Sequence, residues 1–121
     1  VPLPVSAPFH CSLMAPAAAR LAERLAGVRI GPEVTRVFSN VEARPYPGPE
    51  AAAALLVRQV SSPVRWEETV RALAAAGVRV VVEVGPGTVL SGLVSRIDPS
   101  LAVHHFEAPE ELPALAALAG S

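Results

Sequence analysis

The stretch that decides the fold is VRVVVEVGPG, residues 78–87, where a valine-rich run ends at two glycines and a proline. A nearly continuous run of valine is typical of a strand buried on both faces of a parallel sheet. The Gly85-Pro86-Gly87 sequence predicts a tight turn into a short helix over residues 89–97. We therefore expect a buried strand over residues 78–84, followed directly by a turn and a helix.

Strand and helix patterns alternate along the rest of the chain. Apolar residues at helical spacing, bounded by glycine or proline, predict helices over residues 12–25, 49–60, 65–76 and 110–119. Short apolar runs predict strands over residues 1–5, 34–38 and 101–106, and the proline-rich segment 44–50 predicts a loop. This alternation predicts an α/β fold, a mostly parallel sheet with packed helices. No break in composition divides the chain, so we expect a single partial domain over residues 1–121.

The composition narrows the class of protein. Hydrophobic residues make up 51% of the 121 residues, which is high for so short a chain, and the sequence starts at Val1 without a methionine. We interpret both features as signs of a truncated chain whose core belongs to a larger domain.

The net charge is −1 and no basic run occurs, which argues against nucleic-acid binding. The apolar runs are too short to span a membrane. The single cysteine, Cys11, is compatible with a reducing cytoplasm.

His10 is the first candidate catalytic residue. It lies just after an expected strand and just before an expected helix, a place where α/β enzymes often carry working side chains. An imidazole can act as a general base and then as a general acid near neutral pH. The alternative is a loop histidine that bonds a backbone group.

Gln59 is the second candidate. It shares a helix face with Leu55 and Leu56, close to the end of the expected helix. One interpretation is a core glutamine or a helix cap. The other uses the backbone, because carbonyls at a helix end lack intrahelical donors. Such a carbonyl could accept the Nδ1 hydrogen of a catalytic histidine, as an aspartate does in other triads.

The remaining motifs point to no metal and no cofactor. Gly85 and Gly87 form an incomplete nucleotide fingerprint, which we interpret as a structural turn, although the following helix N-terminus could receive an anion. His104 and His105 are neighbours on a strand and face opposite ways, so they make a poor zinc pair. Asn40 is either a turn residue or an amide in a pocket. No G-x-S-x-G nucleophile elbow occurs in the sequence.

An ordered set of short segments resembles one enzyme family. The segments are LPVSAPFHC (3–11), LMAPAA (13–18), SNV (39–41), LVRQV (56–60), PVRW (63–66) and EVGPGTVLSGL (83–93). Together they resemble the malonyl-CoA:acyl carrier protein transacylases and the related acyltransferase domains of fatty acid and polyketide synthases. The resemblance implies the C-terminal part of the large α/β-hydrolase-like subdomain of an acyltransferase.

The resemblance also implies an activity and its residues. A serine would take malonyl from malonyl-CoA and pass it to the phosphopantetheine thiol of acyl carrier protein, for fatty acid biosynthesis in the cytoplasm. His10 matches the catalytic histidine, and Gln59 matches the glutamine whose main-chain carbonyl orients it. Phe9 matches a position where phenylalanine accompanies a preference for malonyl over methylmalonyl. We expect Asn40 to bind substrate as well.

Parts of the family's catalytic machinery are missing from this sequence. The resemblance places the serine, the carboxylate-binding arginine and the oxyanion-hole amides before the region seen here. We therefore expect the 121 residues alone to be inactive, since a base without its nucleophile cannot transfer an acyl group. Three alternatives stay open: an acyltransferase domain of a polyketide synthase, a non-catalytic module that docks acyl carrier protein, and a nucleotide-binding α/β domain.

Overall fold

The computed structural model describes residues 8–119, so the strand expected over residues 1–5 lies outside the described residues. The chain divides into two compact units, Val1–Thr69 and Val70–Ser121. Each unit is described by itself below. The single partial domain over residues 1–121 stays a prediction.

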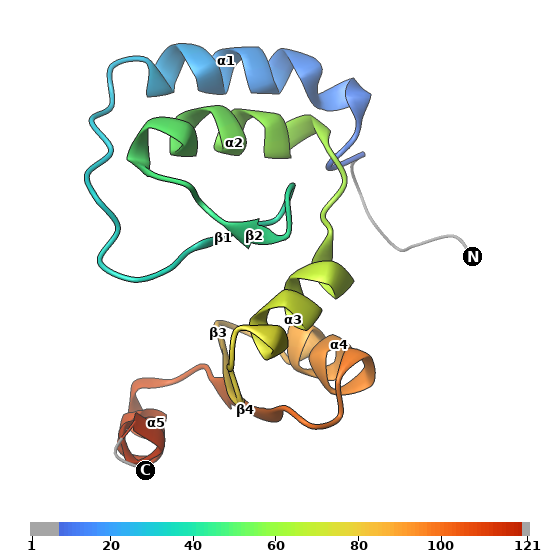
Figure 1. The fold of residues 1–121 in the computed structure, drawn as a ribbon, viewed down its shortest axis with the longest axis vertical. Helices are drawn as coiled ribbons and strands as arrows, with labels where there is room; N and C mark the ends of the chain where they lie inside the picture. The colour runs from blue at the N-terminus through green and yellow to red at the C-terminus, as the bar shows by residue number, and fades with distance from the viewer. Residues whose placement is uncertain (1–7, 120–121) are drawn as a thin grey trace. The chain divides into compact units, whose positions relative to one another are not determined.

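Two packed helices dominate the first unit. A 3-10 helix, η1 (Ser12–Met14), leads into α1 (Ala15–Leu25), and α2 (Pro49–Ser61) packs against α1. The expected helices over residues 12–25 and 49–60 are thus confirmed. Pro49 occupies the first position of α2, where the missing N–H of proline costs no hydrogen bond. The two helices run antiparallel in Figure 1, so the start of α1 lies beside the end of α2.

A small hairpin completes the first unit. Strands β1 (Phe38–Ser39) and β2 (Arg44–Pro45) pair antiparallel, with Ser39 opposite Arg44. The turn between them closes with a 2.8 Å hydrogen bond from the Ala43 amide to the Ser39 carbonyl, and Ala43 has a positive φ of 53°.

The strand predicted over residues 34–38 is wrong except at Phe38. The side chain of Val34 is fully exposed, and the ladder forms only where residues 44–45 supply a partner. The loop expected over residues 44–50 is wrong at Arg44 and Pro45, which pair with β1, and at Pro49 and Glu50, which begin α2.

The second unit contains one strand–helix–strand motif. Helix α3 (Trp66–Ala75) begins before the boundary of the units and ends within the second unit. Strand β3 (Val80–Val84), helix α4 (Val89–Ile97) and strand β4 (Ala102–Phe106) follow, then η2 (Pro109–Glu111) and α5 (Leu112–Ala119). Strands β3 and β4 pair in parallel, and α4 contacts both of them. The α/β class and the predicted helices of this half are confirmed.

The burial predicted for the valine strand is not observed. Val80 is 44% exposed and Val84 is 71% exposed, because the parallel sheet has only two strands in the described part of the chain. The buried apolar residues of this unit instead include Val94 on α4 and Leu101 just before β4. None of the helices within residues 8–119 has the length and the apolar character that crossing a membrane requires.

Candidate active site

His10 has an unusual backbone conformation. Its φ is +56°, in the left-handed region that residues with a side chain rarely adopt. It lies two residues before η1 and its side chain is exposed. The next residue is held to the same turn, since the Cys11 thiol donates to the carbonyl of Pro8 over 3.1 Å. The imidazole therefore projects from a bent segment directly before the first helix.

The imidazole of His10 meets the end of α2. Its Nδ1 atom lies 2.9 Å from the main-chain carbonyl oxygen of Gln59, the contact that the sequence pattern suggested. A carbonyl oxygen only accepts hydrogen bonds, so this contact requires hydrogen on Nδ1. In the neutral ring, Nε2 then carries a free lone pair. The geometry thus selects one tautomer and leaves the other ring nitrogen able to take a proton.

Gln59 lies in the last turn of α2. Besides the contact with His10, its carbonyl oxygen is approached by the Ser62 amide, over a long 3.5 Å. A separation of 3.5 Å is beyond the usual range for N–H···O bonds, so His10 is the stronger partner of this oxygen.

The two predicted substrate-binding residues, Phe9 and Asn40, make no hydrogen bond or ion pair with the His10 imidazole in the described part of the chain. Phe9 precedes His10 and is 61% exposed. Asn40 lies in the hairpin turn, where its main-chain carbonyl accepts a 2.8 Å hydrogen bond from the Arg65 amide. The roles of Phe9 and Asn40 in substrate binding stay predictions.

Three arginines that are far apart in the sequence converge on Glu42. The carboxylate accepts hydrogen bonds from Arg44 over 2.8 Å and from Arg58 over 2.9 Å, and Arg65 contacts the Glu42 carbonyl over 3.4 Å. The bond from Arg44, then the bond from Arg58 and both positive charges, hold the pKa of Glu42 below its ordinary value, against an opposing effect of burial. Because Arg58 directly precedes Gln59, this cluster ties the end of α2 to the hairpin turn. No local sequence pattern indicates the cluster.

The turn after β3 is closed by a carboxylate of the chain itself. Glu83 accepts hydrogen bonds from the amides of Leu90 (3.0 Å) and Ser91 (2.7 Å) and from the Ser91 hydroxyl (2.6 Å). Thr88, at the N-cap of α4, provides no side-chain cap, so Glu83 takes that role from the preceding strand. The Glu83 carboxylate thus occupies the place at the N-terminus of α4 where an anionic ligand would bind. This supports the interpretation of Gly85 and Gly87 as a structural turn.

The two neighbouring histidines of β4 have different surroundings. His104 is exposed, whereas His105 Nε2 lies 3.3 Å from the Gly85 carbonyl and 3.4 Å from the Glu107 carboxylate. No group of three potential metal ligands occurs within the described residues.

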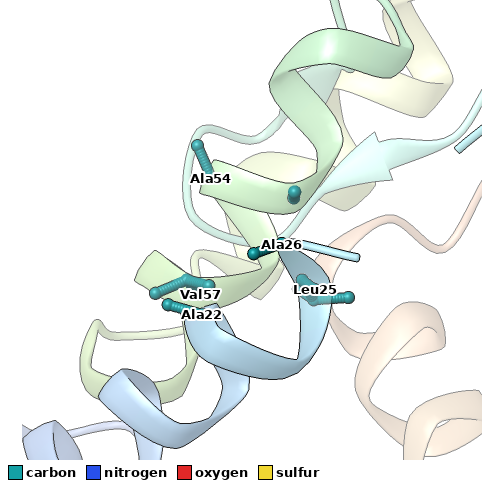
Figure 2. A pocket seen from close by; sticks show the side chains of 6 residues that line it. Ala22, Leu25, Ala26, Ala54 and Val57 are labelled. Atoms are coloured by element: carbon teal, nitrogen blue, oxygen red, sulfur yellow. The ribbon is translucent and has the colours of Figure 1, made fainter. Parts of the chain in front are cut away.

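Among the hollows of the first unit formed by described residues are two mainly apolar ones that His10 does not line. The first, of about 360 Å³, lies between α1 and α2 (Figure 2) and is lined by apolar side chains from the end of α1 and the middle of α2: Ala22, Leu25, Ala26, Ala53, Ala54 and Val57. The second, of about 380 Å³, is lined partly by Glu33 and Tyr46. Neither hollow includes a predicted site residue.

Comparison with known proteins finds malonyl CoA-acyl carrier protein transacylases similar to this chain. The chain is 41% identical over 114 residues to the malonyl CoA-acyl carrier protein transacylase of Escherichia coli K12. The aligned region covers 94% of this chain and 37% of that protein. The chain is homologous to a part of the malonyl CoA-acyl carrier protein transacylases. No protein-family model matches it. The chain therefore spans little more than a third of the length of this transacylase relative.

Solved transacylase structures agree with the sequence comparison. The acyl-carrier-protein S-malonyltransferase of Bartonella henselae matches with a TM-score of 0.91 at 39% identity, over 98% of this chain and 38% of that one. A malonyl-transacylase solved in complex with a type II polyketide synthase acyl-carrier protein matches with a TM-score of 0.86 at 41% identity, over 97% of this chain and 38% of that one. The resemblance to transacylases and the α/β fold class are thereby confirmed.

Proposed function

We propose that this chain is a portion of an enzyme that moves malonyl from coenzyme A to the phosphopantetheine thiol of acyl carrier protein through a serine ester. The observation that carries the proposal is the 2.9 Å contact between His10 Nδ1 and the Gln59 carbonyl. It leaves Nε2 of an exposed imidazole free, as a general base requires. The transacylase relatives at 41% identity supply the reaction class.

His10 serves both halves of the proposed transfer. In the first, Nε2 takes the proton of the serine hydroxyl while the serine oxygen attacks the malonyl thioester carbonyl. The carbon–sulfur bond then breaks, and the proton passes from Nε2 to the departing coenzyme A sulfur. In the second half, Nε2 takes the proton of the carrier-protein thiol as its sulfur attacks the ester. The serine oxygen leaves and recovers a proton from Nε2.

Gln59 orients this base throughout. Its carbonyl holds Nδ1–H, so the ring keeps one tautomer and one orientation. When Nε2 gains a proton, the same bond becomes charge-assisted and stabilises the imidazolium. A carbonyl supplies no full negative charge, so its main contribution is positional.

The serine would belong to a part of the protein outside these 121 residues. The isolated chain is therefore proposed to be inactive. A polyketide synthase setting is a second candidate, supported by the similarity to a malonyl-transacylase that forms a complex with a polyketide synthase carrier protein. A non-catalytic module that binds carrier protein is the third.

The test uses the chain joined to its native upstream sequence. The protein is mixed with malonyl-CoA, and the malonyl adduct is followed by intact mass spectrometry. We expect His10→Ala to slow adduct formation by about 10²- to 10⁴-fold. His104→Ala removes a histidine that is exposed on β4 and is the matched control. Equal rates in the wild type and His10→Ala would overturn the role of His10. No adduct in any variant would overturn the transfer and favour the docking module.

A further inference from the structure

The position of Pro63 relative to Gln59 has a direct chemical meaning. In an α-helix, the carbonyl of residue i accepts a hydrogen bond from the amide of residue i+4. For Gln59 that residue is Pro63, which has no amide hydrogen. The usual intrahelical donor to the Gln59 carbonyl is therefore chemically absent.

Proline also decides where α2 ends. The residue before a proline is disfavoured in the helical region. Ser62 accordingly adopts an extended conformation, with φ −115° and ψ 151°, directly after the last helical residue, Ser61. The Ser62 amide reaches the Gln59 carbonyl only over 3.5 Å. The carbonyl therefore keeps an accepting position for His10 Nδ1, at 2.9 Å.

The chain after Pro63 is fixed away from this carbonyl. The Arg65 amide donates to the Asn40 carbonyl over 2.8 Å, and the Arg65 guanidinium contacts the carbonyl of Glu42. These bonds tie the segment after the helix to the hairpin turn, so no later amide folds back onto Gln59.

We infer that Pro63 is a positioning residue for the proposed transfer: by withholding an amide hydrogen, it reserves the Gln59 carbonyl for His10 and so sets the tautomer of the base. The inference rests on the proposed function for its catalytic meaning. Its structural core, competition between two donors for one carbonyl, can be tested with or without catalysis.

The first experiment needs no substrate. The chain joined to its native upstream sequence is labelled with ¹⁵N at histidine, and the ring nitrogens of His10 are recorded by NMR, with exposed His104 as the internal reference. In the wild type we expect hydrogen on Nδ1 and a free Nε2 in the neutral ring. Pro63→Ala supplies the missing N–H, so we expect a mixture of tautomers and slow hydrogen exchange at the amide that the substitution introduces. An unchanged Nδ1–H tautomer in a folded Pro63→Ala chain would overturn the inference.

Two controls separate the missing hydrogen from the proline ring. Pro49→Ala changes the other end of α2, where an added amide competes for no catalytic carbonyl, so it should leave the His10 signals unchanged. A semisynthetic chain with lactic acid at position 63 has an ester in place of the amide, and therefore neither ring nor N–H. We expect it to keep the wild-type tautomer. If it behaves like Pro63→Ala, the ring and not the missing hydrogen is responsible, and the inference fails.

A second readout uses the chain joined to its upstream sequence. Pro63→Ala should lower kcat by about tenfold or more with little change in KM, since a misoriented histidine impairs the chemical step and not binding. If no variant transfers malonyl, the proposed function fails while the NMR result still decides the donor competition. If transfer occurs and Pro63→Ala has wild-type kcat, Pro63 has no positioning role in catalysis.

Discussion

His10 and Gln59 are 49 residues apart in the sequence, yet Nδ1 of one lies 2.9 Å from the carbonyl oxygen of the other. The antiparallel packing of α1 on α2 is what brings them together, because it places the start of the first helix beside the end of the second (Figure 1). The contact uses a main-chain atom of Gln59. Substitution of its side chain therefore tests the geometry less directly than substitution of Pro63.

We predict that the 121-residue chain alone transfers no malonyl. It supplies the proposed base, but nucleophilic catalysis also needs a positioned nucleophile. The measurement is mass spectrometry of the purified chain with malonyl-CoA, beside the same chain joined to its upstream sequence. A malonyl adduct on the isolated chain, formed at a rate near that of the longer protein, would contradict the prediction.

We predict that Phe9→Ser reduces the preference for malonyl over methylmalonyl. A phenyl ring next to His10 crowds an α-methyl branch, whereas a serine side chain leaves room for it. A pocket that differs by one methyl group typically discriminates by about 10- to 200-fold, which bounds the expected change in the ratio of kcat/KM values. Competition between the two coenzyme A thioesters measures that ratio in the longer protein. Leu13→Ala, another exposed apolar residue near His10 in the sequence, is the control. An unchanged ratio in Phe9→Ser would exclude Phe9 as the determinant.

We predict that the stabilising effect of Glu83 depends on pH. The hydrogen bond from the Ser91 hydroxyl, followed by the amide bonds of Ser91 and Leu90 and the nearby His105, lowers the pKa of Glu83 below its ordinary value of 4.5, against an opposing effect of burial. A carboxyl with a lowered folded-state pKa stabilises the fold above its unfolded pKa and loses this effect as the pH falls through the folded value. Glu83→Gln should therefore lower the melting temperature at pH 7.

The difference between Glu83→Gln and the wild type should shrink as the pH falls below 4.5. Thermal unfolding of both chains over a pH series measures it, and the comparison cancels the titration of the other carboxylates. Glu110→Gln, an exposed change elsewhere in the second unit, serves as the control. A difference that stays constant down to low pH would show that the charge of Glu83 is unimportant.

We predict opposite effects from two glycine substitutions in the second unit. Gly92 lies exposed within α4, and an added Cβ would meet nothing within 4 Å. Gly92→Ala should therefore stabilise the chain by about 0.5–1 kcal/mol. Gly87 has a φ of +84°, so Gly87→Ala should destabilise it by about 1–2 kcal/mol. Urea unfolding measures both changes, and equal effects would contradict this account of the turn.

Local patterns in the sequence predict the helices well because local residues decide them. Pro49 starts α2, and Gly77, with a φ of +94°, follows α3. The β1–β2 hairpin is different, since Phe38 and Ser39 form a strand only through pairing with Pro45 and Arg44. The cap that Glu83 provides for α4 also escapes local rules, because the carboxylate comes from the preceding strand and not from the N-cap residue.

Some features of the candidate site can likewise be predicted from the sequence, and others cannot. The residue types of His10 and Gln59 are visible in the sequence, and so is the four-residue spacing from Gln59 to Pro63. The convergence of Arg44 and Arg58 on Glu42 is not visible, because it depends on how the hairpin turn meets α2. Residue types and spacings within one segment can therefore be predicted from the local sequence, whereas the Glu42 cluster depends on contacts between separate elements.

The antiparallel helix pair also limits how the chain can change in length during evolution. Inserting one residue in the first turn of α1 would move His10 by about 1.5 Å along the helix axis and turn it by about 100° around that axis. Either displacement is enough to break a 2.9 Å contact. The loop between α1 and β1 lies outside this pair, so an insertion there does not change the interval between His10 and α1. Length variation among homologues should therefore gather in that loop, while the interval from His10 through α1 keeps a constant number of residues.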